Sequence, residues 1–178
     1  MGERPIYPYI YNVSGVPLFD FMAKKGGVFS VCGGSGRELN CTFDERSISI
    51  EDASDPRFHL SAVVDVLGSL HLDLYPRRFP QGERHPDLYA AKFIENALRY
   101  FKRKGVVIHD FIASWERGGT NFEEFMGAHE RQQGDEKGAA AQTWSARTMA
   151  KHGFTNIENI IVGEDKVVVS FSEASSVK

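Results

Sequence analysis

The chain has 178 residues, of which 42 % are apolar and 25 % are charged, as expected of a soluble globular protein with one sizeable core. A net charge of −3 argues against a surface built throughout for nucleic acid. No apolar run approaches the roughly 20 residues of a membrane helix, and the N-terminus lacks a signal-peptide pattern. We therefore predict one domain over residues 1–178, without a membrane partner. We expect it in the cytoplasm or delivered from a larger secreted chain.

The first half of the chain is predicted to be mainly β-structure. An irregular arm over residues 1–27, with a short helix at Leu18–Lys25, precedes strands at Val28–Val31 and Leu39–Phe43. The glycine-rich segment Gly33–Gly36 between them predicts a hairpin turn. A phosphate cradle is the alternative, but the segment lacks the Gly-Lys-Ser/Thr ending and the following helix of that motif.

Cys32 and Cys41 flank this turn and are interpreted as free thiols. They could lie near each other across the hairpin. Two cysteines do not make a zinc site, and the six histidines show no metal-ligand spacing, so we predict no metal.

Three more strands follow, at Ser47–Ile50, Ala62–Val66 and Ser69–Tyr75. The last of these alternates, so that His71, Asp73 and Tyr75 share the face opposite its leucines. An imidazole, a carboxylate and a phenol on one face suit proton transfer, and a solvated strand surface is the plainer interpretation.

The most basic part of the chain lies between Arg77 and Lys104, where eight basic and three acidic residues give a net charge of +5. It contains a strong amphipathic helix predicted to begin at Pro86 or Asp87 and to end at Lys104, before Gly105. A local basic patch suits an anionic ligand such as a nucleotide or a phosphate, and a solvated helix face is the plainer interpretation.

Beyond this helix we predict a buried strand at Val106–Ala113 and a helix opened by a capping box, Thr120–Glu123. A second helix follows at Ala139–His152, then a closing hairpin of Ile157–Val162 and Lys166–Phe171. Residues 172–178 are predicted to fray.

The functional candidates of this half lie mostly at element ends. Glu116 and His109 are candidates for proton transfer, and Trp115, Asn121 and Trp144 for substrate contact. Each also has a structural interpretation, as an exposed surface group, a helix cap or a core residue.

The mixed order of strands and helices indicates an α+β domain with a mixed, largely antiparallel sheet flanked by helices. From Ser47 onward, that order resembles the GNAT acyltransferase fold. There, a fourth strand leads to a phosphate-binding loop and a helix, and a fifth strand, a helix and a final hairpin follow. The loop here, Arg78–Arg84, contains one glycine, where that family carries Gly-x-Gly or Gly-x-Ala. The resemblance implies acetyl-CoA or another acyl-CoA as cofactor, held by Arg77, Arg78, Gly82 and Arg84 before the helix N-terminus.

A second resemblance covers about 50 residues and is to the C-terminal domains of Rhs-type bacterial polymorphic toxins. It rests on Trp115, Gly119, Asn121, Phe125, Ala140, Ala141, Thr143, Trp144, Gly153 and Phe154. It implies a bacterial effector and a cognate immunity protein as partner, without naming a reaction.

The leading hypothesis is therefore a GNAT-like acyltransferase, related to toxin modules. His71, Asp73, Tyr75, His109 and Glu116 are its candidates for proton transfer. The rivals are a toxin of another chemistry, such as an ADP-ribosyltransferase or a nuclease, and a non-catalytic immunity or binding protein.

Overall fold

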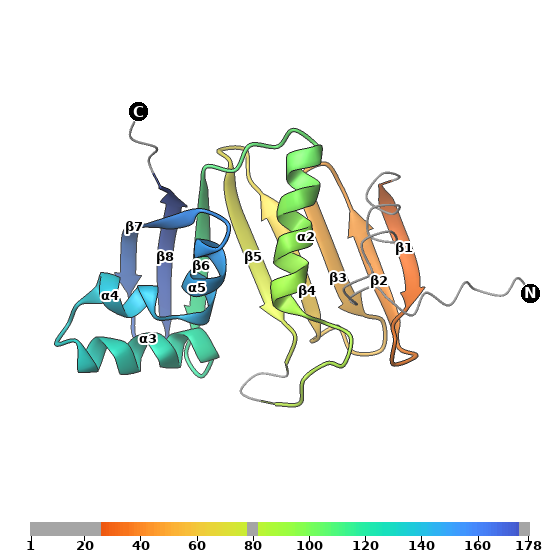
Figure 1. The fold of residues 1–178 in the computed structure, drawn as a ribbon. Coiled ribbons are helices and arrows are strands. Elements are labelled where there is room, and N and C mark those ends of the chain that lie inside the picture. Colours follow the sequence, from red (N-terminus) through yellow and green to blue (C-terminus); the bar gives the residue numbers. More distant parts are fainter. Residues whose placement is uncertain (1–25, 78–81, 175–178) are drawn as a thin grey trace, which may run out of the picture. The chain divides into compact units, whose positions relative to one another are not determined.

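A computed structural model of the chain describes residues 26–77 and 82–174 (Figure 1). Within these ranges the strand order is β1-β2-β3-β4-β5-β6-β8-β7, and only β5 and β6 run parallel among the pairs whose direction is defined. The predicted α+β class, with a mixed and largely antiparallel sheet flanked by helices, is confirmed. The predicted arm and its helix at Leu18–Lys25 lie almost entirely outside the described residues.

The chain divides into two compact units. The described part of unit 1 comprises residues 26–64, 72–77 and 82–107, and that of unit 2 comprises residues 65–71 and 108–174. Strand β5 (Ser69–Tyr75) contributes its first three residues to unit 2 and its last four to unit 1.

Unit 1 is built on an antiparallel meander. Its four strands are β1 (Gly27–Cys32), β2 (Glu38–Phe43), β3 (Ser47–Asp52) and β4 (His59–Val64). The alternation of buried and exposed residues along them places Leu39, Ile48, Ile50 and Leu60 in the core. The segment Gly33–Gly36 forms the predicted hairpin turn, closed by a bond from the Gly33 amide to the Arg37 carbonyl.

The two cysteines are not opposite each other in this hairpin. Cys32 pairs with Glu38 and Cys41 with Phe29. Both thiols are free, as predicted; Cys41 is buried and Cys32 half-buried.

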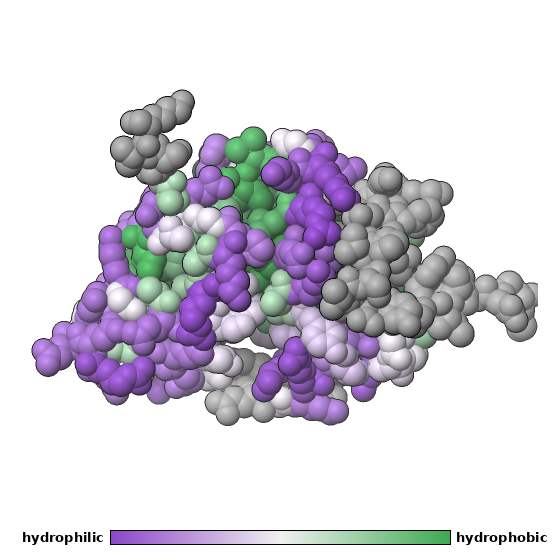
Figure 2. Space-filling view, viewed as in Figure 1, coloured by the Kyte–Doolittle hydropathy of each residue, from purple (hydrophilic) through white to green (hydrophobic). Residues whose placement is uncertain are grey.

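Helix α2 (Ala90–Arg103) covers the buried side of this meander. The apolar side of this predicted amphipathic helix is buried: Phe93, Ile94, Ala97 and Phe101 are fully buried, and Leu98 is half-buried. Its outward side is hydrophilic (Figure 2), and Glu95 there bonds to both Lys92 and Arg99 at 2.8 Å. The helix begins later than predicted, because residues 85–87 bond to other segments before it starts.

Unit 2 contains the parallel pair and the closing hairpin. Ser69 of β5 lies opposite Asp110 of β6 (Asp110–Glu116), and β6 pairs along its whole length with β8 (Lys166–Glu173). Strand β7 (Phe154–Val162) completes the hairpin. Strand β6 begins at Asp110, four residues after the predicted start at Val106, and β8 extends to Glu173, within the tail predicted over residues 172–178.

Three helices complete unit 2: α3 (Thr120–Arg131), α4 (Glu136–Ala141) and α5 (Trp144–Ala150). The capping-box prediction is wrong for Thr120, because Gly119 is the N-cap and no side chain caps the helix there. Glu123 does accept from the Gly118 amide, at 3.1 Å. The single helix predicted over Ala139–His152 is also wrong, because α4 ends at Ala141 and Thr143 caps the separate helix α5. None of the described helices is long and apolar enough to span a membrane.

Candidate functional site

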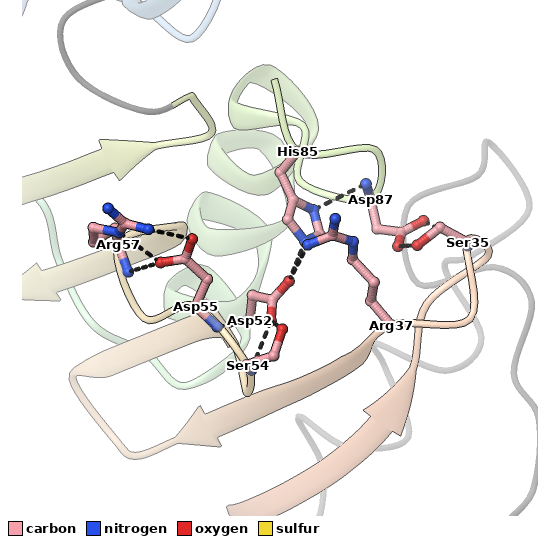
Figure 3. A network of polar contacts seen from close by, with 8 residues as sticks. All are labelled: Ser35, Arg37, Asp52, Ser54, Asp55, Arg57, His85 and Asp87. Carbon is pink, nitrogen blue, oxygen red and sulfur yellow. Dashed lines mark hydrogen bonds and ion pairs between the residues drawn. The ribbon is translucent and has the colours of Figure 1, made fainter. Parts of the chain in front are cut away.

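A network of polar side chains lies in unit 1, between the ends of β1 to β3 and the segment before α2 (Figure 3). Asp52, His85 and Asp87 are buried in it, and exposed side chains bond to them from the side of the solvent. At its centre is Asp52, the last residue of β3, whose side chain is 0 % exposed. Its carboxylate accepts from His85 at 2.8 Å, from Arg37 at 3.0 Å and from the Ser54 hydroxyl at 2.5 Å. A buried carboxylate is costly unless several donors satisfy it, and here they do.

The donors determine the charge of Asp52. Burial alone would raise the pKa of Asp52, but the bonds from Ser54, Arg37 and His85 outweigh it and hold the pKa far below its ordinary value. The carboxylate is therefore ionised at neutral pH, and Arg37 balances its charge.

His85 is satisfied at both ring nitrogens. Its Nε2 faces the Asp52 carboxylate, and its Nδ1 accepts the Asp87 backbone N–H at 3.1 Å. The ring must therefore carry its hydrogen on Nε2. Since neither nitrogen is left to take a proton from a substrate, the network holds structure in place and is not a catalytic base.

The glycine-rich turn between β1 and β2 binds the side-chain carboxylate of Asp87. The carboxylate of Asp87 accepts from the Ser35 backbone N–H at 3.1 Å and from the Ser35 hydroxyl. A side chain at Gly33 would collide with that carboxylate. The place considered for a phosphate is thus filled by Asp87, and the hairpin-turn interpretation is confirmed.

The predicted cofactor residues lie beside this network. Arg77 and Arg84 are exposed and form a two-residue antiparallel bridge, and Gly82 is half-buried between them in sequence. The Arg84 guanidinium lies 5.1 Å from the ring centre of Tyr89, the N-cap residue of α2. Arg78 lies outside the described residues.

On the predicted face of β5, Asp73 and Tyr75 contact His59 and not His71. Asp73 accepts from His59 of β4 at 3.0 Å, and the His59 ring lies 4.9 Å from that of Tyr75. The other His59 nitrogen lies 3.1 Å from the Pro56 carbonyl. Both partners are hydrogen-bond acceptors, so both ring nitrogens of His59 are engaged. We name His59, Asp73 and Tyr75 the β4–β5 cluster.

His71 bonds elsewhere, within unit 2. Its Nε2 lies 3.2 Å from Asp65, which also accepts from the amides of Leu67 and Ser69 in the β4–β5 turn. The bond from Ser69, then that from His71, lowers the pKa of Asp65. His71 and Asp73 therefore bond to different partners, although both belong to β5.

Two of the predicted substrate residues in unit 2, Asn121 and Trp144, take part in hydrogen bonds that join α3 to α5. The first three amides of α5 are all capped by side chains. Trp144 N–H donates to Glu124 at 2.6 Å, Ser145 N–H to Asn121 at 3.0 Å, and Ala146 N–H to Thr143 at 3.3 Å. Asn121 therefore joins α3 to the start of α5.

Trp115 extends this arrangement into β6. Its indole N–H donates to the Ser145 hydroxyl at 3.0 Å, and the residue is 4 % exposed. Trp144 is half-buried. Glu116, opposite Lys166, and His109 are exposed, and the His109 amide bonds to the Gly68 carbonyl. Glu116 and His109 are thus not brought into the β4–β5 cluster by any described contact.

Sequence reasoning missed His59, His85 and Asp52. The Asp52-Ala53-Ser54 segment did carry a local signal, because an aspartate two residues before a serine is typical of a turn closed by the carboxylate. Nothing local in the sequence indicates that His59 meets Asp73, 14 positions later.

Comparisons with known proteins gave no relative. No protein-family model matches the chain, and no curated protein or solved structure is significantly similar to it. Among residues 26–77 and 82–174, no group of three or more His, Cys, Asp or Glu side chains is arranged to hold a metal ion.

Proposed function

We propose that the chain is an acyltransferase domain that uses acetyl-CoA or another acyl-CoA. The observation that carries the proposal is the connection from β5 through α2 to the parallel strand β6, followed by a closing hairpin that places β8 beside β6. This is the order of elements that the GNAT resemblance implies. Such a likeness of fold supports a class of activity, and the site must carry the chemistry.

The start of α2 supports the binding of an anionic cofactor. The first turn of α2 contains no acidic residue, and no side chain caps its amides. Arg77 and Arg84 are exposed on the bridge that precedes it. Free helix amides together with arginines favour a phosphate or pyrophosphate. We place the CoA phosphates there, with Gly82 leaving the backbone accessible.

The β4–β5 cluster supports proton transfer. His59 and Asp73 are partly exposed, at 29 % and 58 % of their side-chain surface, and Tyr75 adds a phenol to the same cluster. In this proposal Asp73 and the Tyr75 phenol of the cluster, and not the His59 ring, take the proton from the acceptor group as it attacks the thioester and pass it to the departing CoA thiolate. His71, His109 and Glu116 stay predictions, and so does a cognate immunity protein.

Calorimetry with acetyl-CoA tests the proposal. We expect a heat of binding for the wild-type chain and a several-fold weaker affinity for Arg84→Ala. Arg117→Ala is the matched control, since Arg117 is an exposed arginine of unit 2 that pairs with Asp165. Absence of any heat at millimolar acetyl-CoA would contradict the proposal.

A further inference from the structure

The segment before α2, residues 82–89, is held in place at three points and is called the leader segment here. At its first point the His85 amide donates to the Pro76 carbonyl at 2.8 Å, beside the Arg77–Arg84 bridge. At the second, the His85 ring bonds to Asp52 of β3. At the third, Asp87 bonds to Ser35 in the β1–β2 turn. Three separate segments of unit 1 therefore fix eight residues.

The third point is unusually tight. Asp87 is 8 % exposed, and both of its carboxylate oxygens accept hydrogen bonds from one residue, Ser35. Hydrogen bonds to an ionised carboxylate are about twice as strong as neutral ones. The turn approaches so closely that only glycine fits at position 33.

Four residues of the leader segment are exposed, and one of them, Arg84, is assigned to the cofactor; the others are Glu83, Pro86 and Tyr89. Arg84 comes one residue before His85, and Tyr89, two residues after Asp87, is the N-cap of α2. The cation–π contact between Arg84 and Tyr89 spans the two fixed residues. A shift of His85 or Asp87 is therefore transmitted to Arg84 and to the first turn of α2.

We infer that Ser35 and Asp87 are positioning residues, which hold Arg84 and the start of α2 in place for the phosphates of the acyl-CoA. This inference rests on the proposed function. It assigns a role to the β1–β2 turn, which is distant in sequence from the cofactor residues and would not itself contact the cofactor. Small displacements of a binding group reduce affinity strongly, so the effect is measurable.

The test compares acetyl-CoA with acetyl-pantetheine, which carries the same thioester but no pyrophosphate or nucleotide. Affinity for both is measured by calorimetry for the wild type, Ser35→Ala and Asp87→Asn. Ser49→Ala is the control, a half-buried serine in the middle of β3. Amide hydrogen exchange over the leader segment and thermal unfolding are recorded for each variant. If Asp87→Asn fails to fold, Ser35→Ala and Gly33→Ala take its place.

We expect Ser35→Ala and Asp87→Asn to weaken acetyl-CoA binding several-fold and to speed exchange in the leader segment. Acetyl-pantetheine affinity should not change, whereas a general loss of structure would weaken both ligands. If the variants bind acetyl-CoA as the wild type does, or lose both ligands equally, the inference is overturned and the proposed function stands. If the wild type binds no acetyl-CoA, the proposed function fails and the inference fails with it.

Discussion

The imidazole of His85 donates a buried hydrogen bond of 2.8 Å to the carboxylate of Asp52, which joins the leader segment to the end of β3. Both side chains are 0 % exposed, and the two residues are 33 positions apart in the chain. Contacts of this kind fix where a helix begins relative to a sheet, because neither group can turn to water. The start of α2 is set by them as much as by its own residues.

The first prediction concerns the stability that depends on Asp52. Asp52→Ala leaves His85 and Arg37 without their shared acceptor, so we expect a loss of about 3–5 kcal/mol in the free energy of unfolding. Chemical denaturation measures it. Arg117→Gln, which changes the exposed Arg117–Asp165 pair of unit 2, should leave the denaturation midpoint unmoved. Equal denaturation midpoints for Asp52→Ala and the wild type would show that the hydrogen bonds of Asp52 do not stabilise the folded chain.

The second prediction concerns pH. The pKa of Asp52 is lower in the folded chain than in the unfolded chain. The ionised carboxylate therefore contributes fully to the free energy of unfolding above the ordinary pKa of about 4, and this contribution is lost progressively as the pH falls below that value. The difference in unfolding free energy between the wild type and Asp52→Asn should therefore be constant near neutrality and shrink in acid. Denaturation curves at a series of pH values measure it. A difference independent of pH would be inconsistent with an ionised Asp52.

The third prediction concerns the two thiols. Burial raises the pKa of Cys41 to about 12, so its reactive thiolate is scarce at neutral pH. In a Cys32→Ser variant, we expect no modification of Cys41 by a maleimide reagent until the chain is unfolded. Full modification in denaturant is the control. Rapid labelling of the folded variant would place Cys41 at the surface.

The fourth prediction separates structural from substrate roles in unit 2. Asn121→Ala and Thr143→Ala each remove one acceptor at the start of α5, so each should cost about 1 kcal/mol of stability. Thermal unfolding measures this loss. Acetyl-CoA affinity should remain that of the wild type. A variant of Asn121 with unchanged stability and reduced activity would restore the substrate role predicted from the sequence.

The fold class follows from local patterns in the sequence. Alternation along Leu39–Phe43 and Ser69–Tyr75, and the apolar stripe of α2, each depend on residues close in the chain. Element boundaries depend on more distant partners. The strand predicted from Val106 begins at Asp110, and the helix predicted from Asp87 begins at Ala90, because Asp87 bonds to Ser35.

The site was less predictable than the fold, for a physical reason. Asp73 and Tyr75 share a strand face as expected, yet their histidine comes from the neighbouring strand β4. His71 fits the same alternation but is bound by Asp65 in the preceding turn. Cross-strand partners depend on register, and the register between two strands cannot be read from the residues of one strand alone.

The most direct test of the central proposal is a titration of the ¹⁵N-labelled chain with acetyl-CoA, followed by NMR. We expect saturable shifts of the amides of Arg84 and of the first turn of α2, Ala90–Phe93. The amides of β7, in unit 2, should not move. Absence of saturable shifts, or shifts confined to residues outside unit 1, would contradict the assignment of the cofactor to this end of α2.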